Sequence, residues 1–147
     1  MSLKKYKSLI EKQEEIKKQL KEIGPEAIKE IFKPYFKKHS KLKSIKLYGF
    51  APYFNDGDPC VFHIREYMTK IISKNGNVIG EESDTEDEEG FIKELKLSEE
   101  ETNSLWSEIS SEVGKLDEDL CEYLFGDSFE VTIYKDRIEI DSYSAPY

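Results

Sequence analysis

The sequence has few of the residues from which catalytic and metal sites are usually built. It contains two cysteines, Cys60 and Cys121, two histidines, and eight glycines that are scattered singly, so no glycine-rich phosphate-binding loop is recognisable. The cysteines form neither a close pair nor a secreted disulfide framework, which favours reduced thiols in an intracellular protein. We expect each cysteine to be a small buried apolar residue.

Long apolar runs are also missing. No segment approaches the roughly 18 apolar residues that cross a bilayer. The N-terminus has a Lys-rich amphipathic pattern rather than that of a secretory signal. A chain of 147 residues most economically forms one domain with a single core. We therefore expect a single cytoplasmic domain over residues 1–147 that makes no membrane contact.

Charge is distributed unevenly along the chain. Residues 1–46 carry fourteen Lys, six Glu and no Arg, whereas the rest of the chain is acidic enough to make the total charge -9. The sequence thus describes a basic N-terminal segment on an acidic body. Because the charges of one molecule interact over about 8 Å at physiological salt, the two parts can attract each other without any partner.

The N-terminal segment has the apolar spacing of helices. Apolar residues recur every three or four positions over residues 3–23, with Gln13 as the one polar interruption, which predicts an amphipathic helix. Gly24-Pro25 suits the end of one helix and the start of a second, which should reach about Lys38 with a kink at Pro34. We therefore expect a helical hairpin over residues 1–40 that packs on the sheet that follows. The apolar residues of the first helix, which also permit a homodimer through this helix, are Tyr6, Leu9, Ile16, Leu20 and Ile23.

From Leu42 onward the apolar period changes to two, which predicts a strand that ends near Phe54. Asp56-Gly57 is a favoured hairpin turn, and it would place Gly49 opposite Ile64. Asn75-Gly76 is a second hairpin signal between extended segments, so three strands should form a meander.

The second half of the chain predicts a loop, a helix and a hairpin. Seven carboxylates in residues 81–90 predict a solvated, mobile acidic loop. Ser98 and Glu101 form a capping box for one long helix that Gly126 closes. A turn at Lys135-Asp136 then sets Val131 opposite Ile140 and Ile133 opposite Ile138 in a C-terminal hairpin. The expected fold is α+β, with an antiparallel sheet of about five strands.

Catalytic, metal and cofactor chemistry is not predicted. Cys60 and His63 lie three apart in a strand and face opposite sides, so they cannot share one zinc ion. The oxygens of Asn55, Asp56 and Asp58 do not have the spacing of a calcium loop and are typical of a turn. Because no nucleophile stands beside a base and an orienting group, we do not expect an enzyme.

The most specific surface that the alternation predicts is the outer face of the first hairpin. Aromatic residues and Arg are enriched in protein interfaces, and here they gather on one face. Alternatively, the N-terminal helices cover this face and make it core. The candidate binding face consists of Tyr48, Phe50, Tyr53, Phe54, His63, Arg65 and Tyr67.

These features favour a noncatalytic protein-binding module. One alternative is nucleic-acid binding through the Lys-rich N-terminal helices, which the absence of Arg there and the acidic body oppose. Another alternative is an acidic mimic of a nucleic acid that inhibits a host protein by occupying its basic groove.

Two segments carry a resemblance to other proteins. Residues 48–62, which contain Pro52-Tyr-Phe-Asn-Asp-Gly-Asp-Pro-Cys60 followed by Phe62, and residues 124–133 resemble a loose group of small uncharacterised proteins from tailed phages and bacteria. The match covers about twenty-five residues and leaves out the Lys-rich helices and the acidic segment. The resemblance implies a cytoplasmic protein of phage or bacterial context and assigns no catalytic residue.

Overall fold

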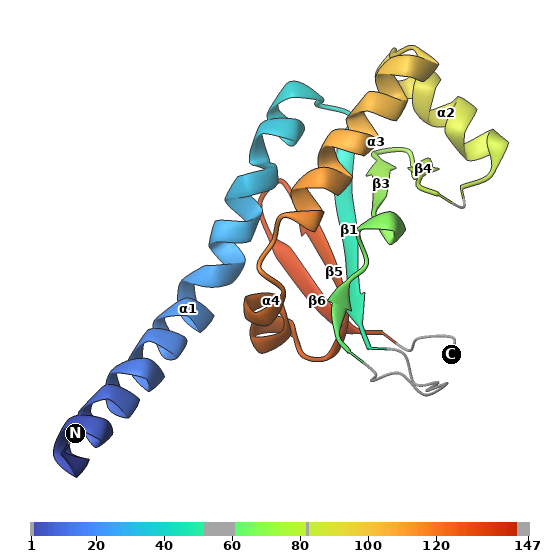
Figure 1. Cartoon of the computed structure of the whole chain (residues 1–147). Coiled ribbons are helices and arrows are strands. Elements are labelled where there is room, and N and C mark those ends of the chain that lie inside the picture. Colours follow the sequence, from blue (N-terminus) through green and yellow to red (C-terminus); the bar gives the residue numbers. More distant parts are fainter. Residues whose placement is uncertain (1, 52–60, 82, 144–147) are drawn as a thin grey trace.

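One long helix, a group of strands, three helices and two final strands follow one another along the chain in an α+β fold (Figure 1). The computed structural model describes residues 2–51, 61–81 and 83–143. In these ranges, no helix is both long and apolar enough to cross a membrane. The elements are α1 (Leu3–Lys38), β1 (Leu42–Phe50), β2 (His63–Ile64), the 3-10 helix η1 (Glu66–Met68), β3 (Lys70–Ser73), β4 (Val78–Ile79), α2 (Thr85–Leu95), α3 (Glu99–Gly114), α4 (Glu118–Phe125), β5 (Ser128–Tyr134) and β6 (Ile138–Ser142).

The six described strands form one antiparallel sheet in the order β4-β3-β1-β5-β6, with β2 paired to the end of β1. The predicted meander and C-terminal hairpin are both present in it. Gly49 lies opposite Ile64, as predicted. The pairs Val131 with Ile140 and Ile133 with Ile138 are likewise confirmed. In the C-terminal hairpin, alternation and the position of the turn together predicted the observed register.

The hairpin between β3 and β4 is tied to α2. Gly76 has a positive φ of 89°, which suits glycine in this tight turn. Glu94 of α2 accepts a hydrogen bond from the Asn75 N–H and one from the Asn77 side chain, each 3.0 Å long. Burial acts to raise the pKa of Glu94, but hydrogen bonds from Ser73, Asn77 and Asn75 outweigh it and leave the pKa below its usual value.

The hydrophobic core fills the space between one face of the sheet and the helices. Gly49 is needed in it, because a Cβ there would lie 2.5 Å from a Phe129 ring carbon and 2.9 Å from a Phe62 ring carbon. The helices contribute buried residues from α1 (Ile28, Phe32, Phe36), α2 (Phe91), α3 (Leu105, Ile109, Val113) and α4 (Cys121, Phe125).

The predicted N-terminal helical hairpin is wrong, because α1 continues as one helix of 36 residues through Gly24, Pro25 and Pro34. A Cβ at position 24 would lie 2.6 Å from Leu124 Cδ1, so this glycine permits α4 to approach closely rather than ending the helix. Only the C-terminal part of α1 packs on the body. Residues 3–23, the projecting arm, are exposed and extend away from it (Figure 1).

The predicted mobile acidic loop is also wrong within its described residues, because its second half begins α2. The Asp84 side chain caps this helix by accepting from the Asp87 N–H at 2.8 Å. Acidic residues in the first turn face the positive end of the helix dipole, which stabilises them there. The acidic residues of that turn are Glu86, Asp87 and Glu88.

The predicted long helix is divided in two. The Ser98–Glu101 capping box of α3 and the end of α4 at Gly126 are confirmed. Between them, the Asp117 side chain starts α4 by accepting from the Leu120 N–H at 2.8 Å. This second cap turns the chain, so that α4 can pack beside α1.

Candidate interaction surfaces

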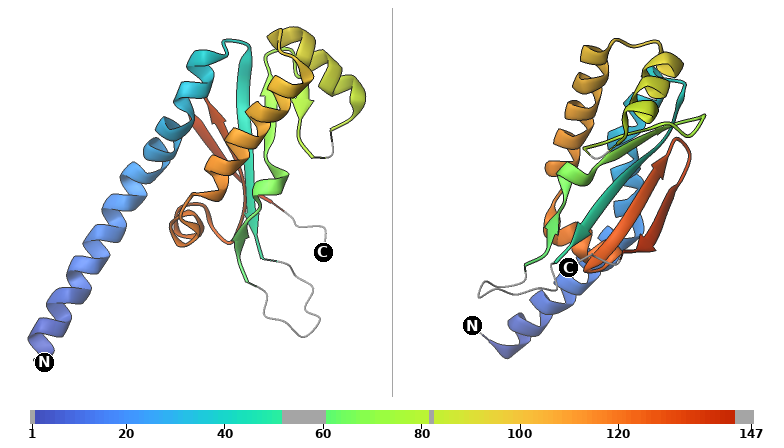
Figure 2. Two further views of the ribbon diagram at one scale, coloured as in Figure 1. Left: turned by 45° about the horizontal axis from the view of Figure 1, so that its top comes forward. Right: turned by 90° about the vertical axis from the view of Figure 1, so that its right-hand side faces the viewer.

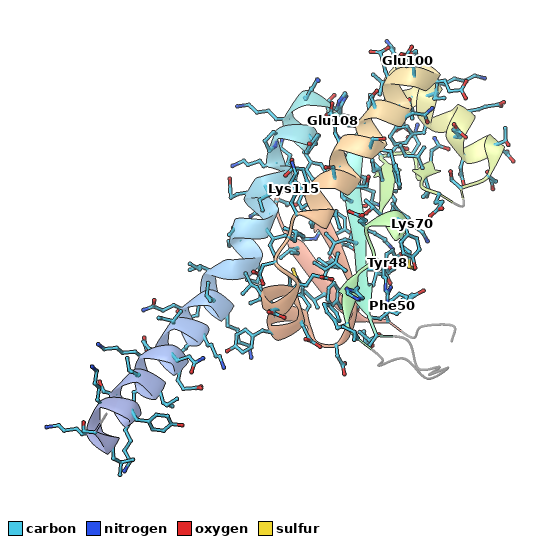
Figure 3. All side chains as sticks on the ribbon, in the orientation of Figure 1. Tyr48, Phe50, Lys70, Glu100, Glu108 and Lys115 are labelled. Carbon is cyan, nitrogen blue, oxygen red and sulfur yellow. The ribbon has the colours of Figure 1, made fainter. Side chains whose placement is uncertain are left out.

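Tyr48 and Phe50, at the centre of the predicted binding face, are only 4% and 1% exposed. The Tyr143 ring centre lies 5.1 Å from that of Tyr48 and 5.5 Å from that of Phe50. The Arg65 guanidinium is 4.6 Å from the Phe50 ring centre, and the Lys70 ammonium is 5.5 Å from that of Tyr48. These five residues form an outer aromatic cluster on the sheet face opposite the helices, and three of them are labelled in Figure 3.

Polar contacts fix this cluster in place. The Tyr48 hydroxyl donates to Glu130 Oε1 at 3.2 Å, and Lys46 Nζ lies 3.0 Å from the same oxygen. Burial, followed by the Glu130 charge, raises the pKa of Tyr48 well above its usual value. Arg65 also donates to the Phe50 carbonyl at 3.1 Å. The contacts are those of a packed structural unit, which leaves little of Tyr48 or Phe50 for a partner.

The rest of the predicted face is divided. Tyr53 and Phe54 lie outside the described residues. His63 is exposed, and its Nδ1 lies 3.2 Å from Glu118 Oε2, which also accepts from the Ile64 N–H at 2.7 Å. Glu118 therefore covers a backbone donor at the open edge of β2.

The N-terminal helix does not cover the predicted face, contrary to the alternative that the sequence left open. Its buried residues belong to the core on the opposite side of the sheet. A groove of about 560 Å³ lies beside the cluster, between Tyr67, which is 44% exposed, and the acidic start of α2. No group of three or more His, Cys, Asp or Glu side chains in the described ranges is placed to hold a metal ion.

The thiol and imidazole groups have separate environments. Cys121 is buried, as predicted, and burial together with Asp117 and Glu118 raises the pKa of its thiol to about 12. Burial, followed by the Lys38 charge, lowers the pKa of His39. Cys60 lies outside the described residues, as do the turn residues Asn55, Asp56 and Asp58.

A second surface runs along α1. Eight large apolar side chains between Leu3 and Ile31 are 36–68% exposed. Five of them, together with Gln13 and Ala27, lie in one row with alternating spacings of three and four. We call this row the α1 stripe: Tyr6, Leu9, Gln13, Ile16, Leu20, Ile23 and Ala27.

The body cannot cover the α1 stripe. The residues of α1 that pack on the body are Gly24, Ile28, Phe32 and Phe36. At 100° per residue, they point about 110° away from the α1 stripe. One helix thus carries two apolar faces, and only one of them is buried.

The sequence identified the large residues of the α1 stripe and predicted that they pack on the sheet or form a homodimer through this helix. Their spacing continues unbroken past Gly24-Pro25, which was the available sign of a single helix. Comparison of the chain with protein-family models, curated proteins and solved structures gave no match.

Proposed function

We propose that this chain is a noncatalytic protein-binding module, and that its α1 stripe binds the apolar face of another helix. The observation that carries the proposal is the arm, which projects from the body (Figure 2). Five large side chains of the α1 stripe are 36–60% exposed on it. A helix that only had to cover the sheet would not need this second face.

Helix energetics support this use of the arm. Helices in proteins gain most of their stability from packing an apolar face, and the arm has no such packing within its own chain. Burying the exposed half of one Leu or Ile contributes about 1 kcal/mol. The opposite side of the arm carries charges at i,i+4 spacing, such as Glu14 with Lys18 and Lys18 with Glu22, and is suited to solvent.

The described polar groups support a noncatalytic role. A reactive cysteine needs a lowered pKa and access to solvent, whereas Cys121 is 1% exposed and has a raised pKa. The described hydrogen-bond partner of the His63 side chain is Glu118, on the surface. Neither residue forms a nucleophile–base pair with another described side chain.

Nucleic-acid binding through the Lys-rich helix is less well supported. Along α1 the lysines are interleaved with glutamates, and Lys29 and Lys33 lie 3.0 Å and 3.7 Å from Glu26 and Glu30. Such pairing weakens the one-sided positive field that phosphate binding needs. Acidic mimicry is also less supported, because acidic first turns already have a structural role at α2 and α3.

Photocrosslinking in cells that produce the full chain tests the proposal. We expect p-benzoylphenylalanine at position 16 or 20 to give protein adducts, and the same residue at position 18 to give few. Ile16 and Leu20 lie on the α1 stripe and Lys18 on the opposite side, so the three variants differ only in the face that they probe. Nuclease-sensitive adducts, equal labelling of both faces, or no adducts at all would overturn it.

A further inference from the structure

The α1 stripe has the repeat of a coiled-coil seam. From Tyr6 to Ala27 its spacing alternates between three and four, which is the a and d pattern of three heptads about 30 Å long. The flanking g positions hold Lys5, Lys12, Gln19 and Glu26. The e positions hold Leu3, Ile10, Lys17 and Gly24.

Charge opposes a parallel pair of these helices. In a parallel coiled coil, each g residue faces the e residue of the next heptad on the other helix. Lys12 would then face the partner's Lys17 on both sides of the seam. Like charges in such positions are destabilising.

An antiparallel pair removes this conflict, because g then faces g. In the register that places Tyr6 opposite the partner's Ile23, Lys5 meets the partner's Glu26, and Lys12 meets the partner's Gln19. Glu26 is exposed, so it can accept a second lysine besides Lys29. Gln13 of each copy lies opposite Ile16 of the other copy, in the two adjacent central layers of the seam. The two glutamines therefore do not face each other.

The position of α4, on the e side of the seam, also favours the antiparallel pair. The e residue Gly24 is buried under Leu124, and Lys21 lies 6.0 Å from the Tyr123 ring centre, so α4 stands on the e side. Exposed apolar e residues occur only toward the free end of the arm, where Leu3 and Ile10 are 68% and 40% exposed.

An antiparallel pair brings Leu3 to the partner's α4. Because e faces e, Leu3 lies opposite the partner's Gly24. There the partner's Tyr123, beside Lys21 of the same copy, is 43% exposed. In a parallel pair, Leu3 would stay at the free end, far from both bodies.

We therefore propose that the helix bound by the α1 stripe is α1 of a second copy, running antiparallel, with the end of each arm packed beside α4 of the other copy. This inference rests on the proposed function, because it names the partner of the same stripe. The pair has twofold symmetry and two identical contacts between arm and α4.

Light scattering coupled to size exclusion tests the mass. We expect a concentration-dependent species of twice 17.2 kDa. Ile16→Gln with Leu20→Gln should return it to the monomer, whereas Lys18→Gln with Glu22→Gln, which introduces the same side chains at the same net charge, should not. Circular dichroism checks that both variants stay folded. A monomer at every concentration would overturn the proposal, while protein adducts from position 16 in cells would still support the proposed function.

Disulfide trapping tests the orientation. Tyr6→Cys and Ile23→Cys chains, both also carrying Cys60→Ser and one carrying a size tag, are mixed in glutathione buffer. An antiparallel pair gives the mixed 6–23 disulfide. Predominant 6–6 and 23–23 disulfides would show a parallel pair and overturn the inference.

The contact between the arm and α4 has its own test. Leu3 lies outside the a and d seam, yet Leu3→Gln should weaken dimerisation by about tenfold, because it removes a buried apolar contact. Leu3→Met should restore it. If Leu3 packs on the partner's Tyr123, then Leu3→Gln combined with Tyr123→Ala should weaken the dimer no more than the larger single change. Fully additive losses would overturn this contact.

Discussion

The continuity of α1 can be tested by measuring one distance. Lys7 and Lys33, both exposed, are 26 residues apart, which corresponds to about 39 Å along a single helix. In the helical hairpin that Gly24-Pro25 suggests, the same positions would lie about 17 Å apart, because the second helix would fold back with its axis about 10 Å away. Spin labels at these positions, measured by double electron–electron resonance, should give the longer distance.

Two controls make this distance decisive. The labels are introduced with Cys60→Ser, while Cys121 is buried and should not react, and the labelled protein is diluted with unlabelled chains to remove distances between copies. A second pair, Lys7 with Glu22, lies about 23 Å apart in either arrangement. If the first pair gave the short distance and the second pair were unchanged, the single helix would be refuted, and with it the α1 stripe beyond residue 23.

Three further predictions concern the body. Gly49→Ala should lower the free energy of unfolding by about 1–3 kcal/mol in urea denaturation, because its Cβ would overlap the Phe129 ring in a buried site. In Cys60→Ser protein, the Cys121 thiol should react with Ellman's reagent only after denaturation, since burial raises its pKa to about 12. Above the usual carboxyl pKa of 4.5, Glu94→Gln should lower the free energy of unfolding relative to the wild type. This difference should shrink as the pH falls through the lowered pKa of Glu94, because the wild type then loses the same charge.

Each of these predictions has a contrary outcome. Gly24→Ala meets only the end of the flexible Leu124 side chain and gains helix propensity of about 1 kcal/mol, so a loss as large as that of Gly49→Ala would contradict the packing argument. Rapid labelling of Cys121 in folded protein would contradict its burial. If the loss of unfolding free energy in Glu94→Gln stayed constant down to strongly acidic pH, the charged hydrogen bonds from Asn75 and Asn77 would not be its cause.

The strand registers were predictable because they depend on local signals. The pairing of Ile133 with Ile138 follows from alternation and a two-residue turn, and both signals lie in one short segment. The break at Gly24-Pro25 was predicted wrongly because the same residues serve two purposes. Glycine suits the end of a helix, but it also allows another helix to approach closely, and Leu124, which makes that approach, lies far along the chain.

The acidic segment shows the limit of reasoning from composition. Its carboxylates suggest disorder when they are only counted, but their order places a cap at Asp84 ahead of an acidic first turn, and Phe91 follows at the core. The low exposure of Tyr48 and Phe50 could not be predicted from the sequence for a related reason. Alternation correctly put Tyr48 and Phe50 on the outer face, but it could not show that Tyr143, which follows β6, would cover them.

The angle between its two apolar faces decides what α1 can do. If the α1 stripe pointed in the same direction as Ile28 and Phe32, a longer sheet or a further helix of the same chain could cover it. At about 110° from that direction, it faces away from every described element, while Phe32 is fully buried. Packing of the face that contains Ile28 and Phe32 holds the helix to the body. The α1 stripe stays uncovered on the arm, at a fixed angle to that face. The C-terminal part of α1 therefore anchors the helix, and the α1 stripe of the arm stays exposed.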